Sequence, residues 1–560
     1  MPKTKASAPA KTLTIIDRLR DPSPRARLCT FLAIWLLSSI YFSASTVIHG
    51  RDLLPKSHDE NSYAIQTQML AHGKLWMPEH PLADFFESFQ MLARPVYASI
   101  YFPGSALMYA PGVWLGLPPW VMPVVASGLG VALCYLLVSR LLDGMWGLVA
   151  VMLMLACHWV RMNATLMMSQ SPMMALGLGM LLAWLRWRDA KDWRWAALIG
   201  ACAGWAAIVR PVDALAFAIP VGVAMLLDFR AVPVRKIGIT CAAIVLAAIP
   251  FLSLQLALNK GTTGSFAHAA HTLYLENDQP DTTYGFHKYN PHARPRSTLT
   301  QKEVYYWNFM LKDVERHRPA RLPQIAWERL RLTFDVALPS QLLLVFVMAG
   351  LFALRDAPRR VVTAVPVIFF LLYLPYTFYM EHYVLAIVPL IVALVVMGAQ
   401  RIAAAWNEPA KRIKVEGVVA AVLALGSLAS LPELNPLVRD DLMFGTTSTI
   451  VRRFVRPRVQ TPAVVLVKYD PRENPHDEPV YNSDVAWPDD ARIILAHDLG
   501  PRNAEIIGYF AEKDPRRRFY LFDRTGMFQR KELPLRELGT AGELAGALAP
   551  TTRSTTQSSP

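Results

Sequence analysis

Long apolar runs separated by short polar segments dominate the chain. Each run approaches the ~20 residues that a helix needs to cross the hydrocarbon core of a bilayer. About eleven such runs are present: residues 28–48, 120–139, 146–160, 165–185, 195–209, 212–227, 237–258, 336–354, 361–378, 383–399 and 415–432. The pattern predicts a mainly α, polytopic membrane protein of about eleven transmembrane helices. The first run has basic residues before it but no small-residue cleavage site after it, so we expect an uncleaved helix.

Lysine and arginine gather in the short segments on one side of this predicted bundle. They fill the N-terminal arm, residues 1–27, and the segments around 186–194, 230–236, 355–360 and 401–414. Because cytoplasmic loops retain positive charge, we expect these segments and the N-terminus in the cytoplasm. The long loops at 49–119 and 259–335, the short loop at 376–382 and the C-terminal tail then lie outside. We call the first two the first and second long loops.

The apolar runs and long loops divide the chain into segments. We expect a transmembrane module over 28–258 that includes the first long loop, the second long loop, further helices over 336–432, and an extracytoplasmic domain over 433–550. Strand-like runs at 463–469, 491–497 and 517–523, with a helix-compatible run at 504–511, predict a small α/β fold for that domain. Residues 551–560 are expected to be disordered.

Composition narrows the function classes. Hydrophobic residues make up 53% of the chain and charged residues only 18%, which excludes an ordinary soluble protein. The basic cytoplasmic segments account for the net charge of +14. The long outer regions are also basic, which favours contact with acidic lipid head groups over contact with nucleic acid. All five cysteines lie in or beside apolar runs, so no disulfide is expected.

The first long loop is too polar and aromatic for a simple connector. Residues 61–76, NSYAIQTQMLAHGKLW, and residues 83–92, ADFFESFQML, carry apolar positions at helical spacing. We expect both segments to be interfacial helices that lie along the membrane surface.

A polar cluster, KSHDENSYAIQ, opens this loop. Ser57 and Glu60 fit the S-x-x-E capping box, in which each side chain satisfies the other residue's backbone N–H. That pattern leaves Asp59 and Tyr63 without a role, and on a helix these two lie one turn apart on one face.

Two further clusters sit at predicted helix ends. IVRPVDAL places Arg210 and Asp213 around Pro211, and YMEHYVLAIVPL opens with Glu381, His382 and Tyr383. The apolar runs themselves contain almost no Asp, Glu, Lys or Arg. Ion-coupled transporters carry such groups near the membrane midplane, so we expect the chemistry at the membrane interface instead.

These residues resemble a known family. HDENSYAIQTQMLAHGKL, then residues 80–112, HPLADFFESFQMLARPVYASIYFPGSALMYAPG, then RPVDALAF, are similar to the bacterial membrane glycosyltransferases of the GT-C type. Within these the chain is most similar to the group that includes protein mannosyltransferases, lipid A aminoarabinose transferases and lipopolysaccharide galacturonosyl transferases. The resemblance covers about residues 28–400. It implies the GT-C fold, a polyprenyl-phosphate-linked sugar donor, and inverting transfer on the outer face of the cytoplasmic (inner) membrane. It also implies that Asp59 and Glu60 form the catalytic acidic motif.

The chemistry of a lipid-phosphate donor fits these residues. A glycosidase needs a second carboxylic acid because its leaving group is poor, whereas a lipid phosphate departs as an anion. One carboxylate that accepts the proton of the acceptor hydroxyl then suffices, and Asp59 is the candidate base. Glu60 is the candidate to orient the acceptor, cap the helix or hold a divalent ion. Arginine matches two phosphate oxygens, so Arg94 and Arg210 are phosphate candidates. The other substrate-binding candidates are Tyr63, Glu87, Tyr101, Asp213, His382 and Tyr383.

Structural alternatives stay open for each of these candidates. Asp59 and Glu60 suit helix capping, and Glu87 suits the solvated face of an interfacial helix. Arg210 and Asp213 suit an ion pair at a helix junction. His382 and Tyr383 suit anchors at the membrane interface, and the family often has an Arg-Tyr pair at their position.

The sequence leaves cofactor, partner and function alternatives as well. A divalent metal, Mg or Mn, at Asp59 and Glu60 is possible, as is zinc at histidines of the long loops: His58, His72, His80, His268, His271, His287 and His292. The aromatic stretch 272–291 suits either a sugar or the membrane interface. The expected function is transfer of a sugar to an extracytoplasmic lipid or cell-envelope glycan. The alternatives are a transporter or flippase for a lipid-linked glycan, and a non-catalytic envelope-assembly protein.

Overall fold

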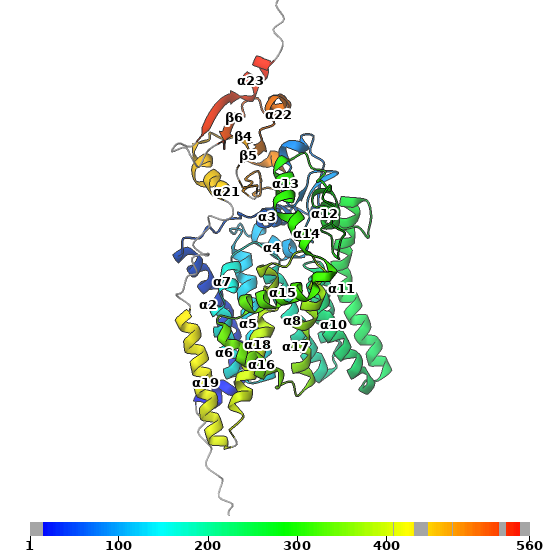
Figure 1. Ribbon diagram of the computed structural model, residues 1–560, viewed down its shortest axis with the longest axis vertical. Helices are drawn as coiled ribbons and strands as arrows, with labels where there is room; N and C mark the ends of the chain where they lie inside the picture. Colours follow the sequence, from blue (N-terminus) through cyan, green and yellow to red (C-terminus); the bar gives the residue numbers. More distant parts are fainter. Residues whose placement is uncertain are drawn as a thin grey trace, which may run out of the picture.

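The computed structural model describes residues 15–406, 408–430, 446–472, 474–475, 477–525 and 534–548. A bundle of long helices fills one end of the molecule and a small sheet domain the other, and the two long loops lie between them (Figure 1). The expected disorder of 551–560 and the first part of the basic arm fall outside the described residues.

Apolar sequence runs form the helices of the bundle. The bundle helices are α1 (Ile15–Arg20), α2 (Pro24–Ile48), α4 (Gly104–Trp114), α5 (Val121–Leu141), α6 (Gly144–Ala156), α7 (His158–Asn163), α8 (Gln170–Ala190), α9 (Trp193–Ala207), α10 (Pro211–Asp228), α11 (Val234–Thr263), α15 (Leu322–Ala337), α16 (Leu344–Leu351), α17 (Ala357–Tyr373), α18 (Val388–Ala403) and α19 (Pro409–Ser430). Their shared core contains large buried side chains such as Trp146, Trp184 and Phe217.

All eleven predicted runs fall on helices, but not all of these helices are full spans. Within the described residues, five helical segments are long and apolar enough to cross a membrane: 24–48, 121–141, 211–231, 234–263 and 411–430. A sixth arises if α15 and α16, which are bent by 106° at their junction, count as one broken span. The other predicted runs form helices that are shorter or more polar, such as α6 and α18. The count of eleven spans therefore stays a prediction.

The first long loop folds differently from the sequence prediction. Residues 58–71 form α3 (His58–Ala71), as expected, but most of its residues are buried rather than lying on a surface. Residues 83–92 were predicted to be helical, and this prediction is wrong. They form a short 3-10 turn, Ala83–Phe86, followed by β2 (Met91–Leu92), which pairs with β3 (Val96–Ser99); β3 also pairs with β1 (Met77–Pro78). The phenylalanines point into a core that the local pattern could not reveal.

The second long loop carries three short helices above the bundle. These are α12 (Ala270–Asp278), α13 (Thr300–Tyr305) and α14 (Leu311–Arg316). They lie between the bundle and the sheet domain in Figure 1.

The tail contains the small α/β fold that its strand-like runs predict. The sheet has the order β5-β4-β6-β7, from β4 (Ala463–Lys468), β5 (Ile493–His497), β6 (Arg518–Asp523) and β7 (Leu535–Thr540). Strand β4 pairs in parallel with β5 and β6, while β7 is antiparallel to β6. Helix α22 (Asn503–Lys513) covers the predicted helical run, and α21 (Thr446–Ile450) and α23 (Ala541–Leu548) flank the sheet.

The sheet domain is docked on the first long loop. Phe85 and Phe86 share one buried core with β4, β5 and α22. The His80 ring lies 3.0 Å from an Asp489 carboxylate oxygen, and the Arg452 guanidinium lies 2.5 Å from Asp52. The domain is therefore packed as part of the molecule rather than tethered to it.

Close packing of α16 against α18 depends on two glycines, Gly350 and Gly398, of which Gly398 leaves less room. A Cβ added to Gly398 would lie 1.8 Å from the Phe346 carbonyl oxygen. We expect Gly398→Ala to destabilise the protein by roughly 1–3 kcal/mol, because overpacking forces the two helices apart. The matched control is Gly222→Ala in α10, where nothing lies within 4 Å of the added Cβ.

Thermal unfolding of the detergent-purified protein measures both effects. A lowered Tm is expected for Gly398→Ala, and an unchanged or raised Tm for Gly222→Ala, since alanine is the better helix former. Equal Tm values for the two variants would contradict the close approach of α16 and α18.

Candidate active site

The start of α3 is fixed by a capping box. Ser57 Oγ accepts a hydrogen bond from the Glu60 N–H at 3.3 Å, and a Glu60 carboxylate oxygen accepts one from the Ser57 N–H, also at 3.3 Å. The other Glu60 oxygen accepts from the Met167 N–H at 3.4 Å, and Glu60 is 3% exposed. The capping role of Ser57 and Glu60 is therefore present, and Glu60 also ties α3 to the bundle.

Asp59 points away from this cap toward two tyrosines. The Tyr101 hydroxyl donates a hydrogen bond to Asp59 Oδ1 at 2.5 Å. The Tyr63 and Tyr101 rings are stacked, with centroids 4.3 Å apart and planes 12° apart. Asp59 and Tyr63, which the sequence placed on one helical face, thus both contact Tyr101.

The electrostatic surroundings of Asp59 raise its pKa. Burial has the largest effect and raises the pKa, and the neighbouring Glu60 adds to it. The Tyr101 hydrogen bond and the positive charge of Arg210 act in the opposite direction. Asp59 is half-buried, so part of the residue is open to solvent. A carboxylate of raised pKa is suited to accept a proton.

Arg210 is held by three partners at the start of α10. Its Nε–H donates to Asp213 Oδ2 at 2.7 Å, Nη1 to Ser169 Oγ at 3.1 Å, and Nη2 to the Tyr373 hydroxyl at 2.9 Å. The Tyr373 hydroxyl in turn donates to the other Asp213 oxygen. The ion pair expected at this helix junction is present. Because a guanidinium has five N–H donors, two remain for another ligand.

Tyr383 packs against the Arg210 guanidinium, and His382 packs against Tyr383. The guanidinium carbon is 4.5 Å from the Tyr383 ring centroid, and the His382 ring meets Tyr383 edge-on at 4.6 Å. Burial and the charge of Arg210 lower the pKa of His382 to about 3. His382 is thus neutral at physiological pH and does not supply the positive charge of an arginine.

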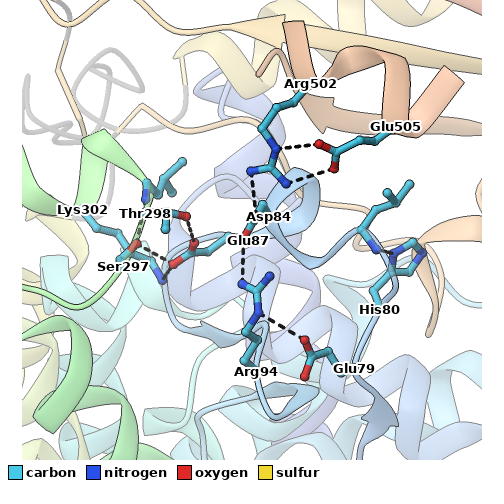
Figure 2. A network of polar contacts seen from close by, with 12 residues as sticks. Glu79, His80, Asp84, Glu87, Arg94, Ser297, Thr298, Lys302, Arg502 and Glu505 are labelled. Atoms are coloured by element: carbon cyan, nitrogen blue, oxygen red, sulfur yellow. Dashed lines mark hydrogen bonds and ion pairs between the residues drawn. The ribbon is translucent and has the colours of Figure 1, made fainter. Parts of the chain in front are cut away.

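Glu87 and Arg94 belong to a different network, which Figure 2 shows. Glu87 pairs with Lys302 of the second long loop at 3.0 Å, and Arg94 pairs with Asp84 at 2.7 Å and Glu79 at 3.2 Å. Within the described residues, neither side chain has a contact with Asp59. The structure therefore separates these two candidates from the group formed by Asp59, Tyr63, Tyr101, Arg210, Asp213, His382 and Tyr383.

Comparisons with known proteins bear on the fold of the chain. The model of the family described as dolichyl-phosphate-mannose-protein mannosyltransferase matches residues 117–254. The crystal structure of ArnT from Cupriavidus metallidurans in the apo state has 13% sequence identity and a TM-score of 0.50, over 93% of this chain and 98% of that chain. Its structure bound to undecaprenyl phosphate has 12% identity and a TM-score of 0.49, over 92% and 98%. No curated protein matches the chain.

The chain has the GT-C fold. The resemblance to GT-C membrane glycosyltransferases, inferred from the motifs around Asp59 and Arg210, is thereby confirmed.

Histidines and carboxylates of this GT-C chain do not assemble around a metal in the described ranges. No group of three or more His, Cys, Asp or Glu side chains there could hold an ion. His268 pairs with Glu276 at 3.3 Å, and His271 stacks on Phe102 with centroids 6.3 Å apart. His80 pairs with Asp489, as described above. The expected metal alternatives find no ligand set here.

Several site residues were missed by the sequence analysis. Tyr373 and Ser169 both accept hydrogen bonds from Arg210. The sequence signal for Tyr373 is the repeated tyrosine between 373 and 383, and Ser169 has no comparable signal. The sheet domain supplies another, Tyr481, whose hydroxyl donates to the Phe89 carbonyl at 3.0 Å. Because that hydroxyl donates its own hydrogen to Phe89, it accepts a hydrogen bond from the Nδ1–H of His58, which lies 2.8 Å away and precedes Asp59 in the chain.

Removal of the Tyr101 hydroxyl should raise the pKa of Asp59, because the hydrogen bond that stabilises the carboxylate is lost. We expect Tyr101→Phe to keep the Asp59 carboxyl protonated to a higher pH. Carbodiimide labelling of protonated Asp59, read by peptide mass spectrometry across a pH series, measures this. Tyr63→Phe is the control, since it keeps the hydrogen bond from Tyr101. An unshifted labelling midpoint in Tyr101→Phe would contradict the role of that bond.

Proposed function

We propose that this protein is a membrane glycosyltransferase that moves a sugar from a polyprenyl phosphate to an extracytoplasmic lipid or cell-envelope glycan. The observation that carries the proposal is the half-buried Asp59 with its raised pKa, held by Tyr101 and influenced by the positive charge of Arg210. A base at the start of α3 and a cation at the start of α10 suit the two changes of charge that this transfer requires. The GT-C fold supports the same class of reaction.

The reaction assigns one task to each group. The acceptor hydroxyl oxygen attacks the anomeric carbon of the sugar, and its proton passes to an Asp59 carboxylate oxygen. The bond from the anomeric carbon to the phosphate oxygen breaks, and the electron pair leaves with the phosphate. Attack from the face opposite the leaving group inverts the anomeric centre. The two remaining N–H donors of Arg210 stabilise the developing phosphate charge.

Glu60 takes a structural role in this mechanism. Both of its oxygens accept hydrogen bonds from backbone N–H groups, of Ser57 and Met167. It is therefore poorly placed to orient an acceptor, and with Asp59 it offers too few free oxygens for Mg or Mn. We assign no step to a metal at this pair.

The proposed location is the cytoplasmic membrane, with the N-terminus in the cytoplasm and the sheet domain outside. The sheet domain and the second long loop lie on the same end of the bundle as Asp59 (Figure 1). An outward orientation of that end gives the site access to a donor sugar on the outer leaflet and to an envelope acceptor. The basic segments at the opposite end support this orientation.

Substitution of Asp59 tests the proposed function. We expect Asp59→Asn to lower kcat by about 10²–10⁴-fold, because an amide cannot accept the proton. The assay uses purified protein, radiolabelled polyprenyl-phosphate sugars and a membrane extract as the source of acceptor. The matched control is Asp281→Asn in the second long loop, where the backbone φ of +62° suits asparagine.

The outcomes separate the rival functions. Transfer that survives Asp59→Asn would overturn the assignment of the base. Movement of intact lipid-linked sugar across reconstituted vesicles, with no transfer from any donor, would favour the transporter instead.

A further inference from the structure

A cavity of about 200 Å³ lies between the first and second long loops, away from the Asp59 group. The first long loop contributes Glu87 and Arg94 to its wall, and the second contributes Asp278, Arg296, Thr298 and Lys302. Drug-sized ligand pockets are typically ~300–1,000 Å³, so this volume suits a single sugar ring. Figure 2 shows Glu87 together with Ser297, Thr298 and Lys302, and Arg94 nearby.

Part of the cavity wall is a buried group of charged side chains in which carboxylates outnumber the ammonium group. The Lys302 ammonium is 3.0 Å from Glu87 and 2.6 Å from Asp278, and Lys302 is only 2% exposed. One cation between two carboxylates leaves a net negative charge. The hydroxyls of Ser297 and Thr298 donate to Glu87 at 2.5 and 3.3 Å. Carboxylate and hydroxyl groups of this kind are the partners that sugar hydroxyls require.

The rim of the cavity carries the opposite charge. In the described parts of the chain Arg296 forms no ion pair, and its one side-chain hydrogen bond, to Asn277 Oδ1, is 3.4 Å long. Arg94 is already neutralised by Asp84 and Glu79. Arg296 therefore has planar N–H donors without an ion-pair partner in the described residues, in the same cavity as the carboxylates and hydroxyls, and such donors match an acidic group on a sugar.

The cavity is one layer of side chains from the Asp59 group. Tyr274 and Leu92 line it, and they pack in one cluster with Ile100 and Tyr101. Tyr101 is the residue that binds Asp59. The two sites are thus distinct, and one cluster of side chains contacts both.

We propose that this cavity binds an acidic sugar unit, with Arg296 on its carboxylate or phosphate and Asp278, Asn277 and Thr298 on its hydroxyls. The view that this unit belongs to the acceptor rests on the proposed function. Binding then holds an acceptor in register while its reacting hydroxyl lies at Asp59. A purely structural role for the charges between the two loops would give no preference among sugars.

The test measures binding alone, with the full-length protein in detergent. Saturation-transfer NMR compares methyl glucuronide and glucose 6-phosphate with the neutral methyl glucoside. We expect the two acidic probes to bind at least about tenfold more tightly, and Arg296→Gln to remove that preference, because one charge-assisted contact is lost. The matched control is Arg294→Gln. Arg294 lies two residues before Arg296, and its guanidinium packs on the Trp307 ring.

The outcomes distinguish this proposal from the proposed function. Equal binding of acidic and neutral probes, loss of preference in Arg294→Gln as well, or no binding of any probe would each overturn the acidic-sugar site. Preference that follows Arg296 alone supports it, and tighter binding of one acidic probe identifies its acid as carboxylate or phosphate. Asp59→Asn should retain the preference. Binding retained in a protein without transfer activity would overturn only the proposed function.

Discussion

The ion pair between Arg210 and Asp213 is the contact on which the reactive end of the molecule depends. Asp213 is completely buried, so loss of either partner would leave an uncompensated charge at a cost of roughly 3–5 kcal/mol. The pair also joins distant parts of the bundle, because Arg210 binds Ser169 beside α8 and Tyr373 at the end of α17. The positive charge of Arg210 also acts on Asp59 and lowers the pKa of its carboxyl. One contact therefore fixes the helix ends and tunes the candidate base.

Above this pair, the first long loop is held from both directions. The capping box and the bond from Met167 to Glu60 attach α3 to the bundle, while Tyr481 attaches its first turn to the sheet domain. The shared core around Phe85 docks the sheet domain on the same loop. A tail that was expected only as an appended domain thus takes part in placing Asp59.

Local patterns predicted the parts of the structure that depend on neighbouring residues. The apolar runs became helices, the S-x-x-E box caps α3, and the strand-like runs of the tail form β4, β5 and β6. The pattern failed where distant partners decide. Residues 83–92 have helical spacing, yet Phe85 and Phe86 pack against strands almost 400 residues later. Arg94 is a phosphate candidate by residue type, and no local signal reveals that Asp84 is its partner in the folded chain.

Asp59 and Glu60 show how one acidic pair divides two tasks. Adjacent residues on a helix point about 100° apart, so both cannot face the same ligand. Glu60 turns inward, where backbone N–H groups satisfy its charge, and Asp59 turns toward Tyr101. The buried Glu60 also affects Asp59, because its negative charge helps to raise the pKa of the Asp59 carboxyl. The carboxylate that starts the helix therefore also makes the adjacent carboxylate a better proton acceptor, and a capping residue is part of the proposed chemistry without contact with substrate.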